Sequence, residues 1–470
     1  MWHEYINATS IDEVIKILGE KKERARIVAG GTDLILELER GVRKGIDTLV
    51  DVTRIPKLDQ ITIGEDDVIH IGALVTHNDC VASKLIRARA YPLARAAWEV
   101  GAPQIRNRGT VAGNLITASP ANDTITPLMA LDASVTLIST RGERIIPLSE
   151  FYTGVRRNVM QADEMLTEIS FPALMESQRG IFIKLALRRA QAISLVNVAI
   201  ILDLKAATRT VKAASITLGA VTPVIVHAVE AEKFLARKKL NEKNIAHAAE
   251  LTMQAAHPID DVRGSAAYRR EMIRVVTKRG LTAIRDGNEQ DGMPKKPILL
   301  AGKKTADRGQ QTVHHLSSII NIIETTINGK KFSFNSGHNK TLLRLLREEG
   351  MLTGTKEGCA EGECGACTIF LDGKAVMACL VPAPRAHGAE IVTVEGLSNG
   401  KKLHPVQDAF IEHGAVQCGY CTPGFVMSAA KLLEEKANPT RNEIEQAITG
   451  NLCRCTGYYK IVKAIETAAK

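Results

Sequence analysis

The nine cysteines are the residues of this sequence best suited to chemistry, and they are unevenly placed. Cys80 lies alone in the first half of the chain, and the other eight lie between Cys359 and Cys455. Thiols crowded together in a reducing compartment bind metal more often than they form disulfides. The sequence therefore predicts a metal-binding C-terminal part, and Cys80 is expected to be a small buried hydrophobic residue.

The first group has the spacing C-x4-C-x2-C with a fourth cysteine further on, and its members are Cys359, Cys364, Cys367 and Cys379. Three thiolates so close together need a loop that curls around the metal, and Gly358, Gly362 and Gly365 permit such a loop. Its amide groups can point at inorganic sulfide. The spacing is that of plant-type ferredoxins, which hold a 2Fe–2S cluster. A structural zinc site is the alternative, although zinc ligands more often come as two C-x2-C pairs.

The second group is a C-x2-C pair and a distant C-x-C pair, and its members are Cys418, Cys421, Cys453 and Cys455. Both pairs lie at the ends of expected helices, so two helix junctions can supply the ligands of a second 2Fe–2S cluster. Zinc would also suit this spacing. The ferredoxin-like group that precedes it favours iron.

The elements that must position these cysteines are short. Asn328-Gly329 and Asp372-Gly373 each lie between β-rich runs and predict two hairpins. A helix is expected at 341–349. Four further helices are expected at 406–413, 425–436, 441–448 and 460–468.

The N-terminal half alternates strands and helices. Ser10 and Glu13 predict a capped helix that ends before Gly19, and a strand at 27–29 runs through Gly30-Gly31 into a helix at 34–38. Bare glycine backbone at such a turn can receive a pyrophosphate, although a Gly-Gly turn is more often only a turn. No GxGxxG is present, so a Rossmann site has no support.

A second polar stretch, 106–123, offers hydroxyl, amide and carboxylate groups for ribityl and phosphate oxygens, or is simply a solvated loop. Further helices are expected at 93–100, 228–236 and 266–284, with strands at 48–52 and 134–138. Residues 286–311 are rich in Gly, Pro and Lys and are expected to be a linker.

The composition limits the classes of function that this chain can have. The chain has 470 residues, enough for about three folding units, and its 45% hydrophobic and 24% charged residues are typical of globular proteins. A net charge of +9 permits a basic docking face. It does not indicate binding of nucleic acid, because no run of Arg and Lys is interleaved with aromatic residues that could stack on bases. With no secretory signal and no apolar stretch of membrane length, a cytoplasmic protein without a membrane span is expected.

Three cysteine motifs together resemble the iron–sulfur subunit of the molybdenum hydroxylases, the xanthine dehydrogenase family. They are Cys359-Ala-Glu-Gly-Glu-Cys364-Gly-Ala-Cys367, Gln417-Cys418-Gly-Tyr-Cys421-Thr-Pro-Gly and Gly450-Asn-Leu-Cys453-Arg-Cys455-Thr-Gly-Tyr. The first half, residues 2–285, resembles the FAD subunit of the same family. The motifs that carry this second resemblance are Gly30-Gly31-Thr32, Thr110-x-x-Gly113-Asn114, Ser119-Pro-Ala-x-Asp123 and Arg263-Gly-Ser-Ala-x-Tyr268-Arg269.

The resemblance implies an α+β multidomain fold. An FAD-binding PCMH-type α/β domain would span 1–176, and a CO dehydrogenase flavoprotein-like C-terminal subdomain would span 177–287. After a linker at 288–318, a β-grasp 2Fe–2S ferredoxin domain would span 319–398 and a four-helix 2Fe–2S-binding domain 399–470. The flavin part precedes the iron–sulfur part, which is the reverse of the single-chain members, so the chain resembles a fusion of two subunits.

The resemblance also implies the cofactor ligands. All eight cysteines match cluster ligands, and the residues matching Gln417 and Cys455 lie against the pterin in the family. The implied FAD ligands are Ala29, Gly30, Gly31, Thr32, Asp33, Thr110, Gly113, Asn114, Asp123, Leu166 and Lys184. The family usually has two glycines before the asparagine, whereas here the first is Ala112, which is expected to alter the backbone approach to the flavin.

The implied function is electron transfer. No side chain need act as a catalytic acid, base or nucleophile, because the cofactors carry the chemistry. Electrons would pass from a separate molybdopterin-binding subunit, through the two clusters, to FAD and then NAD⁺, in a dimer of heterodimers. No molybdenum domain is expected within these 470 residues. Xanthine, and so purine metabolism, is the favoured substrate assignment. The alternatives are an aldehyde, nicotinate or carbon monoxide as substrate, quinone, oxygen or ferredoxin as acceptor, and a stand-alone redox carrier or sensor.

Overall fold

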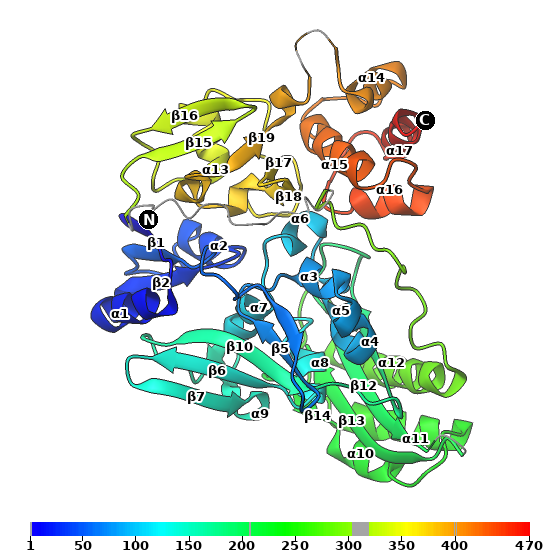
Figure 1. Ribbon diagram of the computed structural model, residues 1–470. Coiled ribbons are helices and arrows are strands. Elements are labelled where there is room, and N and C mark those ends of the chain that lie inside the picture. The colour runs from blue at the N-terminus through cyan, green and yellow to red at the C-terminus, as the bar shows by residue number, and fades with distance from the viewer. Residues whose placement is uncertain (1, 206–207, 303–318, 399, 401) are drawn as a thin grey trace. The chain divides into compact units, whose positions relative to one another are not determined.

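The computed structural model describes residues 2–205, 208–302, 319–398, 400 and 402–470 (Figure 1). Contacts divide the chain into two compact units. The first unit comprises Met1–Pro56, Gly101–Gly109 and Pro297–Lys470, and the second comprises Lys57–Val100 and Thr110–Lys296. Three separate stretches of sequence therefore build the first unit.

The first unit begins with a parallel sheet in the order β1-β3-β2. Its elements are β1 (Glu4–Asn7), α1 (Ile11–Lys21), β2 (Ala25–Val28), α2 (Leu34–Glu39) and β3 (Thr48–Asp51). Ser10 caps α1 by accepting a hydrogen bond from the Glu13 N–H, as predicted. The helix continues past Gly19, where the sequence predicted its end, because one glycine is tolerated inside a helix. It ends before Lys22, which takes a left-handed φ of 48°.

A five-stranded sheet in the order β16-β15-β19-β17-β18 follows in the same unit. Its strands are β15 (Ile323–Ile327), β16 (Lys330–Phe334), β17 (Thr368–Leu371), β18 (Lys374–Met377) and β19 (Glu390–Val392). Both predicted hairpins are present, and all four turn residues, Asn328-Gly329 and Asp372-Gly373, have positive φ. The predicted helix at 341–349 is α13 (Leu342–Arg344) with a π-helical turn at Leu345–Glu349.

The four predicted C-terminal helices are also present. They are α14 (Pro405–Glu412), α15 (Thr422–Glu435), α16 (Arg441–Ala447) and α17 (Tyr459–Ala468). A hydrophobic core that includes Phe425, Leu432 and Ile461 holds them together, and α15 packs against β17. A short helix from the N-terminal half, α6 (Pro103–Arg106), packs against β18 in this unit.

The segment expected to be a linker has two parts. Residues 288–302 form no helix or strand, yet Ile298 and Leu300 are buried in the core of the helical region. The Leu300 carbonyl accepts a hydrogen bond from the Ala375 N–H. Residues 303–318 of the expected linker lie outside the described residues.

The second unit opens with an antiparallel sheet in the order β4-β5-β10-β6-β7. Its strands are β4 (Ile61–Ile63), β5 (Val68–Gly72), β6 (Ser134–Ser139), β7 (Gly142–Pro147) and β10 (Met165–Pro172). A small hairpin, β8 (Tyr152–Gly154) and β9 (Arg157–Asn158), follows α9 (Leu148–Phe151). The other helices of this part of the unit are α3 (His77–Ala82), α4 (Lys84–Arg89), α5 (Tyr91–Glu99), α7 (Val111–Thr117) and α8 (Ile125–Ala130).

The second unit ends with an antiparallel sheet and three helices. The strands, in the order β11-β12-β13-β14, are β11 (Gln178–Leu185), β12 (Val196–Leu204), β13 (Val211–Gly219) and β14 (Val226–His227). The helices are α10 (Val229–Leu235), α11 (Glu242–Gln254) and α12 (Ala266–Asp286). Val196, Ile216 and Ile273 are among the residues of the shared core. Cys80 on α3 is fully buried, as predicted, and burial raises the pKa of its thiol far above the usual range.

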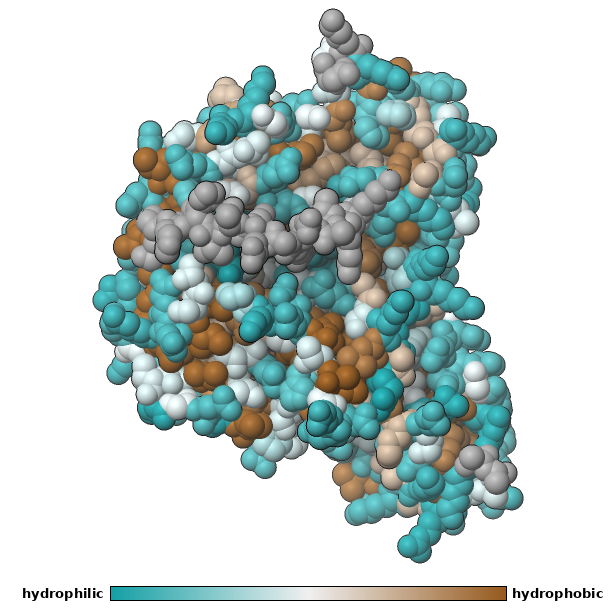
Figure 2. Space-filling view, viewed as in Figure 1, coloured by the Kyte–Doolittle hydropathy of each residue, from teal (hydrophilic) through white to brown (hydrophobic). Residues whose placement is uncertain are grey.

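The surface of the described residues is mixed. Figure 2 shows hydrophobic residues in small groups among hydrophilic ones on the face in view. Among the helices of the described residues, none combines the length and the apolar character needed to cross a membrane.

Candidate cofactor sites

The first cysteine group is assembled by a hairpin and a loop of the first unit. Cys367 precedes β17 and Cys379 follows β18, and because these strands pair, the two thiols hydrogen bond to each other. Cys359 and Cys364 form a second hydrogen-bonded pair in the preceding loop. The loop therefore brings the four predicted ligands together two by two.

Glycines allow this loop to close around the thiols. Gly362 and Gly365 have φ of 74° and 68°, a region that residues with a side chain rarely adopt. A Cβ at Gly358 would lie only 2.8 Å from Cys364 Sγ. The predicted role of the three glycines is thus visible in the geometry.

Backbone amides of the same loop surround one sulfur. The N–H groups of Glu361, Glu363 and Cys364 donate to Cys359 Sγ at 3.3, 3.3 and 3.4 Å. Together with the Cys364 thiol, which contributes most, they lower the pKa of Cys359 to about 5. The loop is therefore built to hold a thiolate, which is the form that binds metal.

The second cysteine group lies at helix junctions, as predicted. Cys421 directly precedes α15, and Cys453 lies in the turn between α16 and α17. These two thiols hydrogen bond to each other, and Cys418 and Cys455 form the other pair with their sulfurs 3.7 Å apart. Burial raises the pKa of Cys421 to about 12.

Cys453 has its own set of donors. Its Sγ accepts hydrogen bonds from the Cys455 N–H and from the N–H and hydroxyl of Thr456, at 3.4, 3.4 and 3.1 Å. Burial acts to raise the pKa of Cys453, but these donors, with Thr456 first, lower it below its usual value. Tyr458 fixes the turn because its hydroxyl oxygen accepts the Cys453 N–H.

The arrangement of the thiols fits two-iron clusters. Each group consists of two contacting pairs, and a 2Fe–2S cluster needs two thiolates on each iron. Among the described residues, which include all nine cysteines, no three His, Cys, Asp or Glu side chains converge closely enough to hold a single metal ion. A zinc ion binds four thiolates at one point, whereas a 2Fe–2S cluster distributes them over two irons.

The glycine loop of the N-terminal half also lies in the first unit. Ala29, Gly30 and Gly31 connect β2 with the residues that lead into α2. A Cβ at Gly30 would lie 2.4 Å from the Arg108 carbonyl oxygen. The Arg108 guanidinium donates to the carbonyls of Ala29 and Gly30 at 2.9 and 3.3 Å. The loop is thus braced by Arg108, a residue that the sequence motifs did not single out.

Burial affects this brace. The Arg108 side chain is partly buried, and desolvation followed by the charge of Arg385 lowers its pKa to about 10. The arginine remains charged at neutral pH and fixes the carbonyl side of the loop. The N–H side of the loop is the one suited to an anionic ligand.

The remaining predicted FAD ligands lie in the second unit. Thr110 caps α7 by accepting the Gly113 N–H at 2.9 Å. Asn114 is held on the same helix by Thr124, whose hydroxyl donates to its Oδ1 at 2.5 Å. Leu166 is buried on β10, which packs against α7. Ala112, which replaces the expected glycine, is buried on α7.

Asp123 and Lys184 form a buried ion pair. Lys184 Nζ on β11 lies 2.6 Å from Asp123 Oδ2, and the side chains are only 5% and 7% exposed. Ser194 Oγ donates to Asp123 Oδ1 at 2.6 Å. Burial still raises the pKa of Asp123, although the charge of Lys184 and hydrogen bonds from Ser194 and Asn197 oppose the shift. Sequence reasoning missed Ser194, because no local pattern links it to a carboxylate 71 residues away.

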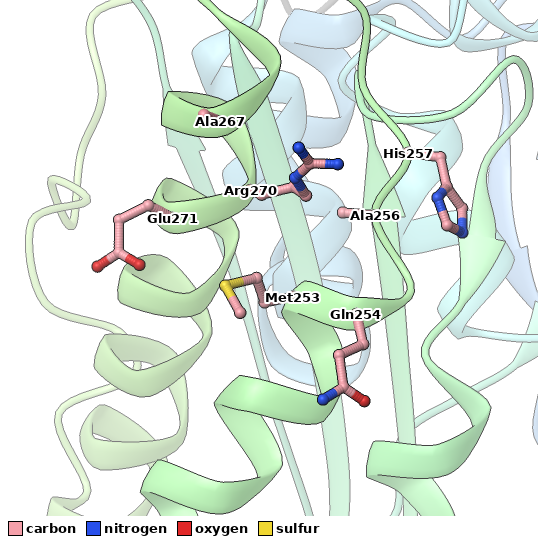
Figure 3. Close-up of a pocket in the computed structure, with 7 residues that line it drawn as sticks. All are labelled: Met253, Gln254, Ala256, His257, Ala267, Arg270 and Glu271. Carbon is pink, nitrogen blue, oxygen red and sulfur yellow. The ribbon is translucent and has the colours of Figure 1, made fainter.

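A separate groove of about 340 Å³ lies between α11 and α12 in the second unit. Figure 3 shows Met253, Gln254 and His257 on one side and Arg270 and Glu271 on α12. No predicted cofactor ligand lines this groove.

Comparison with known proteins accounts for nearly the whole described chain. Residues 2–174 match the FAD binding domain in molybdopterin dehydrogenase, and residues 181–284 match the CO dehydrogenase flavoprotein C-terminal domain. Residues 325–390 match a 2Fe-2S iron-sulfur cluster binding domain, and residues 393–466 match a 2Fe-2S binding domain.

Individual relatives each match about a third of this chain. The nicotinate dehydrogenase small FeS subunit of Eubacterium barkeri is 48% identical over 148 residues, which is 32% of this chain and 94% of the relative. The xanthine dehydrogenase iron-sulfur-binding subunit of Escherichia coli O157:H7 is 49% identical over 145 residues, 30% of this chain and 91% of the relative. The chain belongs to the molybdenum hydroxylase family.

Solved structures cover more of the chain. A chain of carbon monoxide dehydrogenase from Hydrogenophaga pseudoflava matches 60% of this chain and 97% of its own length, with a TM-score of 0.57 and 29% identity. A chain of quinoline 2-oxidoreductase from Pseudomonas putida 86 matches 62% of this chain and 99% of its own length, with a TM-score of 0.58 and 27% identity.

These matches confirm the predicted fold class, with an FAD-binding domain, a flavoprotein C-terminal domain and two 2Fe–2S domains. This member of the molybdenum hydroxylase family is therefore an electron-transfer subunit of an oxidoreductase, with FAD and iron–sulfur domains.

Proposed function

We propose that this chain relays electrons from a separate subunit that carries the molybdenum cofactor, through two 2Fe–2S clusters and FAD, to NAD⁺. The favoured enzyme is a xanthine dehydrogenase-like hydroxylase, supported by the xanthine dehydrogenase subunit among the relatives. When bound, the clusters carry one electron at a time, and FAD accepts electrons singly and delivers a pair. The chain itself holds these groups and tunes them through hydrogen bonds and burial.

The observation that carries this proposal is the different exposure of the two cysteine groups. Cys367 and Cys379 are buried, whereas Cys418 and Cys455 are exposed. The second group therefore opens to the surface, where another subunit can approach. Tyr420 and Tyr459, close to it in sequence, are 48% and 78% exposed, and exposed aromatics near a redox site are typical of a docking surface.

The direction of transfer follows from this exposure. We propose that the exposed site receives electrons from the molybdenum subunit and that the buried site passes them on to FAD. Gln417 is exposed beside Cys418, in keeping with a contact to the pterin of the partner. The proposed ligands of the exposed cluster are Cys418, Cys421, Cys453 and Cys455. The proposed ligands of the buried cluster are Cys359, Cys364, Cys367 and Cys379.

The proposed FAD ligands remain those expected from the sequence. The loop Ala29–Asp33 offers backbone N–H groups to a pyrophosphate, and the Thr110–Asn114 segment offers polar groups fixed by α7. Asp123, Leu166 and Lys184 complete the set. Because Asp123 and Lys184 neutralise each other, this part of the site suits the uncharged portions of the cofactor.

The choice of substrate is made on the partner subunit. Xanthine is proposed first, and the relatives that are named for nicotinate and carbon monoxide define the alternatives. A dimer of such heterodimers in the cytoplasm, without bound nucleic acid, is the proposed assembly. The proposed domain boundaries are 1–176, 177–287, 319–398 and 399–470, with the linker at 288–318.

The deciding experiment is analysis of iron, sulfide, flavin and molybdenum in the complex purified from its native host. We expect four irons and one FAD for each chain, from two 2Fe–2S clusters and one flavin. Zinc in place of iron, or absence of flavin, would refute the proposal. A purified chain that contains both clusters but never a molybdenum subunit would favour a stand-alone carrier. Acceptor assays with NAD⁺, quinone, oxygen and ferredoxin would identify the last step.

Cys453→Ser tests the ligand assignment. This change should remove the electron paramagnetic resonance (EPR) signal of one cluster only and stop the transfer of electrons from substrate to flavin. Reduction of the flavin by NADH should survive, because that step does not pass through the exposed cluster. An unchanged pair of cluster signals would show that Cys453 is not a ligand. Cys80→Ser is the control, since Cys80 is buried in the second unit.

A further inference from the structure

Residues of the two cysteine groups meet directly inside the first unit. The Leu452 N–H donates to the Cys364 carbonyl at 2.9 Å. Leu452 precedes Cys453, and Cys364 is itself a proposed ligand. A through-bond route between the two groups therefore contains one hydrogen bond, and all its other steps are covalent.

A second hydrogen bond runs beside the first. Asn451 Nδ2 donates to the Gly365 carbonyl at 3.1 Å. The two backbones are in close contact here, since a Cβ at Gly365 would lie 2.1 Å from the Gly450 carbonyl oxygen. The junction is too tight to admit a side chain at Gly365.

The orientation of the Asn451 amide is fixed by two donors. Its Oδ1 accepts hydrogen bonds from Ser428 Oγ at 2.7 Å and from Gln104 Nε2 at 3.1 Å. With both donors on the oxygen, the amide nitrogen must face Gly365. Gln104 Nε2 also donates to Ser428 Oγ at 3.0 Å, and all three side chains are buried.

Gln104 comes from a different part of the sequence than the residues it holds. It lies on α6, within residues 2–174 that match the FAD-binding domain, and yet it is part of the first compact unit. Among the described residues, none hydrogen bonds to its buried Oε1, and a Cβ at Gly450 would lie 2.3 Å from that atom. A buried amide that leaves one polar atom unpaired is retained at a cost in stability.

We infer that Gln104 is a positioning residue for electron transfer between the two clusters. It locks Asn451 and so keeps the Leu452–Cys364 hydrogen bond closed. One electron leaves one cluster and enters the other, and no bond or proton is exchanged. The flavin half of the chain thereby controls a step within the iron–sulfur half. This inference rests on the proposed cluster ligands.

The test compares two substitutions on the same segment. Gln104→Met keeps the side-chain length and removes both donated hydrogen bonds. Asn107→Leu is the matched control, because Asn107 is also buried and its amide donates to the carbonyls of Leu300 and Ala375, away from the junction. Each variant is purified as the full chain with its cofactors and partner subunit.

Three measurements separate a positioning role from a structural one. In Gln104→Met, iron content and the EPR signals and midpoint potentials of both clusters should match the unaltered protein. Hydrogen exchange at the Leu452 amide should rise roughly tenfold, the effect of losing about one hydrogen bond of ordinary net strength. Electron equilibration between the clusters after pulse-radiolytic reduction should slow by about threefold or more, because the Leu452–Cys364 hydrogen bond is weaker once Gln104 no longer holds Asn451. Asn107→Leu should change neither quantity.

Either of two results would overturn the inference. One is an unchanged transfer rate in Gln104→Met although Leu452 exchanges faster, and the other is equal slowing in Asn107→Leu. Should Gln104→Met not fold, Ser428→Ala removes one donor to Asn451 and must give a smaller effect of the same sign. If the unaltered protein contains no iron, the proposed function fails, whereas the exchange of Leu452 still shows whether Gln104 holds this hydrogen bond.

Discussion

Replacing Lys184 with Met should expose the cost of an unpaired buried charge. The Lys184–Asp123 pair is nearly inaccessible to water, and removing one partner of a buried pair costs about 3–5 kcal/mol. Asp123 keeps the hydrogen bond from Ser194, so we expect the free energy of unfolding to fall by the lower end of this range, about 3 kcal/mol. Hydrogen exchange in the β11–β12 ladder should then accelerate on the order of a hundredfold.

The pH dependence of this loss has a definite sign. Burial already raises the pKa of Asp123, and removal of the lysine charge raises it further. The ionised carboxylate is the costly form in the variant, so the deficit should shrink as the pH falls and Asp123 takes up a proton. Exchange measured at pH 8 should therefore differ more between variant and unaltered protein than exchange at pH 5.5, both being corrected for intrinsic rates.

Two further variants complete this test. Lys184→Met combined with Asp123→Asn removes both charges. The double variant should have a free energy of unfolding only about 1 kcal/mol below that of the unaltered protein, because no unpaired charge remains. Lys233→Met is the control, since the Lys233–Glu230 pair on α10 is largely exposed and such pairs contribute about 0.5 kcal/mol or less. If the double variant were no more stable than Lys184→Met, the buried pair would not be the cause of the loss.

Three other substitutions test the cofactor sites. Gly365→Ala should lower the iron content, because its Cβ would lie 2.1 Å from a backbone oxygen, whereas Gly373→Ala, with φ of 80° but open space around it, should lose only about 1 kcal/mol and keep its iron. Arg108→Met should lower the flavin content at unchanged iron, because the loop around Gly30 loses its brace. Asn114→Ala should also lower only the flavin content, as measured by flavin and iron for each chain.

Much of the candidate site could be predicted because its causes are local. Cysteine spacing and loop glycines predicted the thiol groups, and Asn328-Gly329 and Asp372-Gly373 predicted hairpins through their φ preferences. The hairpin β17–β18 then brings Cys367 and Cys379 together by strand pairing alone. Patterns of this kind need no knowledge of the rest of the chain.

The parts that could not be predicted depend on contacts between distant residues. The hydrogen bond from Gln104 to Ser428 spans 324 positions, and nothing in the sequence around Gln104 indicates a partner. Ile298 and Leu300 lie in a stretch rich in Gly, Pro and Lys that is typical of a linker, yet both side chains are buried. Local composition describes the average tendency of a segment, whereas burial is decided residue by residue.

The hydrophobic core of the first unit joins residues from both ends of the chain. Trp2, Tyr5 and Val28 share one hydrophobic core with Ile323 and Leu371, and the Trp2 indole N–H donates to the His338 carbonyl at 2.9 Å. This core depends on which surfaces meet and not on which segment comes first along the chain. A connection that leaves these contacts intact therefore preserves the unit, and the junction held by Gln104 is the point at which the same packing reaches the proposed electron path.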